Sequence, residues 1–72
     1  MKISKDMIET AWSRYEEYKE RAEQHEFPEL LFLDSKLVPM YNDLTANWNE
    51  AHAEIFYKWM LVIGKRFGID MP

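Results

Sequence analysis

The chain has 72 residues, a formal net charge of −4 at pH 7, no cysteine, and three Trp, four Tyr and four Phe residues. A chain of this length forms one domain, residues 1–72, and buries only about 60% of the surface that its unfolded form exposes. The absence of cysteine excludes disulfides and thiolate zinc sites. We therefore expect dense aromatic packing, self-association, or both, to stabilise the fold.

The charges are unevenly distributed along the chain. Residues 1–34 carry nine acidic and five basic side chains, whereas residues 35–72 carry four of each. Nucleic acids and anionic membranes attract clustered basic side chains, so the acidic first half argues against both partners. The longest apolar run, Trp59 to Ile63, is far too short to span a membrane, and the charged N-terminus does not resemble a secretory signal. We expect a cytoplasmic protein.

A first helix is predicted over residues 4–25, approximately. Ser4 is a suitable N-cap, because its hydroxyl can accept a backbone N–H of the first turn. Behind it, apolar and aromatic side chains recur at steps of three and four, the spacing of a helix with one buried side. These positions are Ile8, Ala11, Tyr15, Tyr18, Ala22 and His25, with Met7 and Trp12 on the flanks.

The middle of the chain contains two prolines that act as boundaries in the sequence. Pro28 disfavours helical geometry in the residue before it and suits the first turn of a new helix, so short helical turns are expected over about residues 28–38. Pro39 suits a helix start but not a helix interior. The last helix is therefore expected to begin either near residue 40 or at an N-cap at Thr45, and to run to about residue 67.

The last helix turns apolar on all sides in its second half. From Phe56 to Ile63, Lys58 is the only charged residue. A helix of this kind is either deeply buried or covered by another chain, and a domain of this size has little interior. We therefore predict that a second copy or a foreign partner covers this segment. Gly68 can close the helix in a left-handed conformation.

Residue patterns for catalysis or metal binding are incomplete. His52 and Glu54 form an H-x-E pair of the kind found in zinc deaminases, but the cysteine ligands are missing and the two side chains point to different sides of a helix. Neither histidine follows a glutamate at the spacing that a di-iron bundle uses. We expect no catalytic residues, no metal, no cofactor and no enzymatic activity.

The predicted fold is all-α, a helical hairpin with a short helical connection that self-association, as a dimer in the first instance, completes into a bundle. The predicted function is a protein-protein interaction module that acts stoichiometrically as a regulator or inhibitor, in the manner of bacterial or phage accessory proteins. The predicted interface comprises Trp48, His52, Phe56, Trp59, Met60 and Ile63. A possible acidic docking face on the first helix comprises Glu16, Glu20 and Glu23.

An alternative function is the binding of a small, nucleotide-like ligand in an aromatic pocket between subunits. Planar ligands stack on aromatic rings, although aromatic residues at helical spacing more often form a core or a protein contact. Ligand-induced thermal stabilisation would distinguish the two functions. The residues of this alternative pocket are Trp12, Tyr15, Tyr18, Trp48 and His52.

Overall fold

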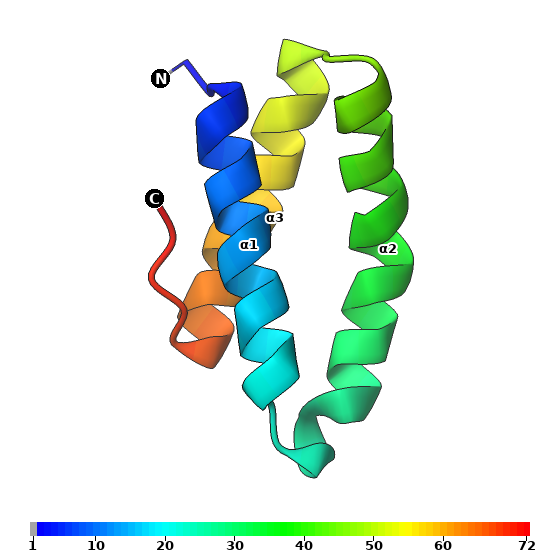
Figure 1. Cartoon of the computed structure of the whole chain (residues 1–72), viewed down its shortest axis with the longest axis vertical. Coiled ribbons are helices and arrows are strands. Elements are labelled where there is room, and N and C mark those ends of the chain that lie inside the picture. The colour runs from blue at the N-terminus through cyan, green and yellow to red at the C-terminus, as the bar shows by residue number, and fades with distance from the viewer. Residues whose placement is uncertain (1) are drawn as a thin grey trace.

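The computed structural model describes residues 2–72, and within them the protein is an all-α bundle of three helices without strands (Figure 1). The helices are α1 (Lys5–Arg21), α2 (Phe27–Ala46) and α3 (Glu50–Phe67), and a 3-10 turn, η1 (Gln24–Glu26), precedes α2. Helix α3 packs against both α1 and α2. The predicted fold class is confirmed, but a three-helix bundle replaces the predicted two-helix hairpin. No helix in the described part of the chain is long and apolar enough to cross a membrane.

Helix α1 begins as predicted. The Ser4 side chain accepts the backbone N–H of Met7 at 3.2 Å, which satisfies one of the free donors of the first turn. Three positions of the predicted apolar side, Ile8, Ala11 and Tyr15, are buried. The spacing of three and four residues therefore identified the inward side of this helix correctly.

Helix α1 ends four residues earlier than predicted. Ala22 has extended backbone geometry, and Glu23 and Glu26 then form a capping box, in which the Glu23 N–H donates to Glu26 Oε2 at 3.3 Å. This local arrangement reverses the chain before Pro28, which lies in the first turn of α2. The side chain of His25 is consequently exposed and outside α1.

Helix α2 is a single helix of 20 residues that contains Pro39, so the predicted break before this proline is wrong. Proline has no N–H to donate to the carbonyl of Ser35, one turn earlier. Both residues are exposed, and water can hydrate this carbonyl. Burial of Leu30, Leu37 and Leu44, which are spaced by seven residues, offsets the loss of this helical hydrogen bond.

Helix α3 begins at Glu50, so neither predicted start is correct. The Asn49 side chain accepts the backbone N–H of His52 at 3.0 Å and caps the helix. The Thr45 hydroxyl instead donates to the carbonyl of Asn42 at 2.9 Å, within α2. Asparagine is at least as strong an N-cap as threonine, and this polar stretch lets the chain turn between α2 and α3.

The C-terminal segment folds back onto the bundle (Figure 1). Gly68 ends α3 in a left-handed conformation with φ of 72°, as predicted. Beyond it, the Ile69 N–H donates to the carbonyl of Gly64 at 2.8 Å, and the Tyr57 hydroxyl donates to the carbonyl of Pro72. This segment therefore covers one side of α3.

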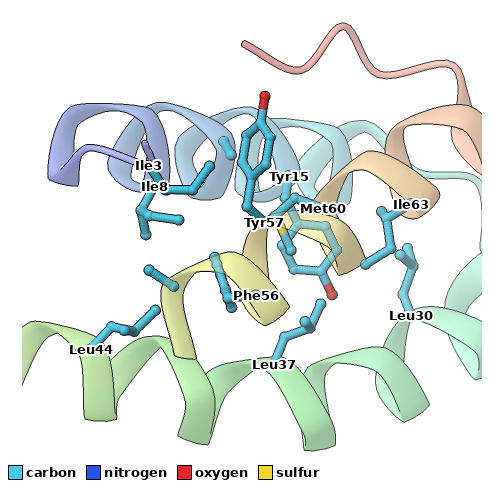
Figure 2. Close-up of a cluster of buried hydrophobic side chains, with 12 residues drawn as sticks. Ile3, Ile8, Tyr15, Leu30, Leu37, Leu44, Phe56, Tyr57, Met60 and Ile63 are labelled. Atoms are coloured by element: carbon cyan, nitrogen blue, oxygen red, sulfur yellow. The ribbon is translucent and has the colours of Figure 1, made fainter. Parts of the chain in front are cut away.

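The core lies where the three helices meet (Figure 2). Leu30, Leu37 and Leu44 project from α2 toward α3. An aromatic cluster joins the three helices: the Trp12 ring of α1 stacks on Tyr41 of α2 at 4.6 Å and lies 5.9 Å from the Phe56 ring of α3. The largest fully buried side chains are Tyr15, Leu37, Phe56 and Met60.

We expect Gly64→Ala to destabilise the full chain by about 1–2 kcal/mol. A Cβ atom at this position would lie 2.7 Å from the Ile69 carbonyl oxygen and 2.9 Å from Met71 Cγ, so the C-terminal segment must shift. In a chain that ends at Gly68 the same substitution should instead stabilise by about 0.5–1 kcal/mol, because alanine favours a helix. Urea denaturation of the four proteins checks this; equal effects in both chain lengths would contradict it.

Candidate functional site

Large exposed hydrophobic side chains are concentrated on two of the three helices. Helices α2 and α3 together contribute Phe27, Leu31, Phe32, Val38, Ile55, Trp59, Leu61 and Val62. Single exposed hydrophobic residues are normal, but contiguous apolar surface marks contact sites. Two surface regions, one between α2 and α3 and one between α1 and α2, are therefore candidate sites.

The first region, here called the apolar face, spans α2 and α3. Pro39, Met40, Asp43, His52 and Ile55 line a hollow of about 340 Å³ between these helices. Trp59 and Val62 follow Ile55 by four and seven residues, so they extend the same side of α3. Phe32 precedes Pro39 by seven residues on α2. The apolar face comprises Phe32, Pro39, Met40, Ile55, Trp59 and Val62.

Charged side chains border the apolar face at both ends. At one end Arg66 Nη2 of α3 donates to Glu29 Oε2 of α2 at 2.9 Å. At the other end His52 Nδ1 lies 3.6 Å from Asp43 Oδ2. Lys36 lies on α2 between these two ends, with its Nζ 5.7 Å from the Phe32 ring centroid. An apolar centre with a polar border is the usual composition of a protein interface.

The structure divides the six predicted interface residues between core and surface. Phe56 and Met60 are 0% exposed and Ile63 is 3% exposed, so these three fill the core of the chain itself. His52 and Trp59 lie on the surface of α3, at the apolar face. In a segment that is apolar on every side, the spacing of the residues does not show which side faces inward.

Trp48 lies in the connection between α2 and α3 rather than within a helix. Its ring is half-buried, and Lys5 Nζ lies 5.9 Å from the ring centroid. Either predicted start would place Trp48 within the last helix, but α3 begins at Glu50 and leaves Trp48 outside it.

The second region, here called the acidic groove, lies between α1 and α2. It is a hollow of about 460 Å³. Two of the three predicted acidic docking residues, Glu16 and Glu20, line it, whereas Glu23 belongs to the capping box of η1. The remaining lining residues are Lys19, Phe27, Leu30, Leu31 and Asp34.

A polar network joins α1 to α2 at this groove. The Tyr15 hydroxyl donates to Asp34 Oδ1 at 2.6 Å, and Lys19 Nζ donates to both Asp34 oxygens at 3.0 and 2.9 Å. Burial, with the hydrogen bond to Asp34, raises the pKa of Tyr15. For Lys19, burial lowers the pKa, but Asp34 and Glu16 outweigh it, so the net shift is upward. The network therefore consists of a neutral phenol, a lysine cation and a carboxylate.

Sequence reasoning missed this network, although a signal for it was present. Asp34 is the one charged residue between Glu29 and Lys36, within the run LLFLDS. A carboxylate in an apolar helical segment requires a partner. Tyr15 and Lys19 are four residues apart on the predicted first helix and could have been recognised as that partner.

Of the five residues of the alternative ligand pocket, only Trp12 and Tyr15 lie together within the described chain, with their ring centroids 5.2 Å apart. Trp12 belongs to the aromatic cluster of the core, and Tyr15 is buried, with its hydroxyl hydrogen-bonded to Asp34 of α2. The Tyr18 ring packs against the end of α3, Trp48 lies in the connection before α3, and His52 lies at the apolar face. A pocket between subunits made from all five stays a prediction.

Within residues 2–72, no three histidine or acidic side chains converge in a way that could hold a metal ion. Comparisons of this chain with known protein families, with curated proteins and with solved structures found no match.

Proposed function

We propose that this protein is a small cytoplasmic protein-interaction module that acts stoichiometrically, as a regulator or inhibitor, and that self-associates through the apolar face. The observation that carries the proposal is the exposure of Phe32 (60%), Ile55 (49%) and Val62 (67%) on adjacent helices. Covering such side chains removes apolar surface from water, which stabilises the complex by about 25 cal/mol for each Å² buried. An 8.7 kDa chain with a small core gains much from this burial.

A second copy is the occupant that best suits the charges of the apolar face. In a two-fold dimer the same surface lies on both sides of the contact, so a surface with net charge repels itself. The borders of the apolar face carry Glu29 and Asp43 against Lys36 and Arg66, which balance. The excess of acid lies in residues 23–34, which form η1 and the first part of α2 and contain four acidic residues and no lysine or arginine. Two copies of the apolar face can therefore meet without net charge repulsion.

The dimensions of the apolar face also suit a dimer. Helices of 20 and 18 residues are about 30 and 27 Å long, and two adjacent helices are about 20 Å wide. A standard interface covers about 800 Å² of accessible surface on each partner. Two such faces in contact would stack α2 and α3 of one chain on α2 and α3 of the other, in two layers of two helices.

We expect light scattering to give twice the 8.7 kDa chain mass at micromolar concentration, and Ile55→Glu/Val62→Glu to weaken the dimer by about 100-fold or more. Both side chains are exposed, so the variant keeps its fold. Leu61→Glu, compared with the single variant Ile55→Glu, is the matched control, because each adds one negative charge at an exposed position of α3 and Leu61 lies outside the hollow that Ile55 lines. A monomeric wild type, or equal effects of the two single variants, would contradict self-association.

A further inference from the structure

The acidic groove has one apolar wall and one acidic wall. Helix α2 contributes Phe27, Leu30 and Leu31, and α1 contributes Glu16 and Glu20. Phe27 is 45% exposed and Leu31 is 70% exposed, so the rest of the chain leaves the apolar wall uncovered.

The one cation that lines the groove is already engaged. Lys19 is held by both oxygens of Asp34, and its Nζ also lies 3.4 Å from Glu16 Oε2. Three carboxylates and one ammonium line the groove, which gives it a net charge of −2. Glu20 is exposed to an approaching ligand, and Lys19 is bound to Asp34.

Both walls continue along the two helices. Val38 follows Leu31 by seven residues, and it is also exposed. Glu9 precedes Glu16 by seven residues on α1 and is exposed as well. Because α1 and α2 run side by side in opposite directions (Figure 1), these positions extend the groove toward the other end of the bundle. Exposed apolar and acidic side chains therefore continue beyond the hollow itself on α2 and α1, and they could contact a bound helix that is longer than the hollow.

We propose that the acidic groove binds a basic amphipathic helix of a partner protein. The apolar side of such a helix covers Phe27 and Leu31, and its lysine or arginine side chains meet Glu16 and Glu20. The excess of acid in residues 1–34 steers a basic segment toward this side of the molecule. This inference rests on the proposed interaction function but not on the dimer, because the groove borders α1 whereas the apolar face borders α3.

The test uses a fluorescein-labelled peptide of about 18 residues, built from leucine and lysine at helical spacing and long enough to form a stable helix on binding. Anisotropy titration with the full chain is expected to show saturable binding of one peptide per chain. Glu16→Gln/Glu20→Gln and, separately, Leu31→Ala should each weaken binding by about tenfold. All three side chains are at least partly exposed, so the variants retain the fold.

Two controls separate the groove from general attraction to an acidic protein. Glu17→Gln/Glu54→Gln makes the same change in net charge outside the groove and should leave the affinity within about twofold of wild type. A peptide of the same composition in scrambled order should bind at least about tenfold more weakly. The inference is overturned by absent or non-saturable binding, by equal effects of the two double variants, or by equal binding of both peptides.

The same titration on Ile55→Glu/Val62→Glu separates this inference from the dimer. Unchanged peptide affinity in that variant supports a groove that works without self-association. A wild-type protein that dimerises but does not bind the peptide refutes the groove and leaves the apolar face in place. A monomeric wild type that binds the peptide refutes the dimer and supports the groove.

Discussion

Phe56→Ala is expected to lower the free energy of unfolding by about 3–5 kcal/mol. The Phe56 ring is 0% exposed and lies 5.9 Å from both the Trp12 and Tyr41 rings, so its removal leaves a cavity where the three helices meet. Small domains are stable by only about 5–15 kcal/mol, and a domain of this size lies toward the lower end. Urea denaturation followed by circular dichroism should show a variant that is largely unfolded or close to it.

Val62→Ala is the control, because Val62 lies six residues further along α3 but is 67% exposed. Its expected effect on the unfolding of the monomer is below about 1 kcal/mol. Measurements at two protein concentrations separate folding from association, because only the contribution of association depends on concentration. A Phe56→Ala protein that folds normally but no longer self-associates would contradict the core position of this residue and restore its predicted place in an interface.

Asp34→Ala is expected to destabilise the protein by about 2–3 kcal/mol. The substitution removes the acceptor of the buried Tyr15 hydroxyl and leaves the partly buried Lys19 ammonium without its main partner. In a domain of this length such a loss lowers the melting temperature by about 10–20 °C. Asp43→Ala is the control, because Asp43 is exposed and pairs only with His52 at 3.6 Å; it should change stability by less than about 0.5 kcal/mol.

A double variant tests whether the unpaired Lys19 ammonium causes the loss of stability in Asp34→Ala. Lys19→Met/Asp34→Leu removes both charges and fills the space with apolar atoms, so it should be more stable than Asp34→Ala. Thermal unfolding of the wild type and the three variants checks both expectations. Equal melting temperatures for Asp34→Ala and Asp43→Ala would show that the network contributes little.

Local chemistry made the first and last turns of the bundle predictable. Ser4 and Gly68 act within a single helical turn, so their roles follow from residue type and position. The inward side of α1 was also predictable, because charged residues occupy most other positions of that helix and leave one apolar side. The all-α class followed from these periodic patterns.

The interior boundaries were harder to predict because tertiary burial decides them. Pro39 weakens a helix locally, but Leu30, Leu37 and Leu44 make one continuous helix favourable across it. The start of α3 depended on a choice between Thr45 and Asn49 as caps, which residue preference alone resolves poorly.

The candidate sites depended on which side of α3 faces inward. Ile55, Phe56, Trp59 and Met60 are all large and apolar, and their spacing allows more than one buried side. Contacts with α1 and α2 bury Phe56 and Met60 and leave Ile55 and Trp59 outside. The acidic groove could not be predicted as a unit, since α2 was expected as short separate turns rather than one helix beside α1.

Pro39 has opposite effects on folding and on binding: it destabilises helix α2, but it gives the apolar face a side chain of fixed conformation. A proline in a helix interior costs about 3 kcal/mol relative to alanine, a cost already incurred when the monomer folds. Its ring has no side-chain rotamers to lose, so covering it entails almost no further loss of conformational entropy. At this position the chain is less stable as a folded monomer but already ordered for contact.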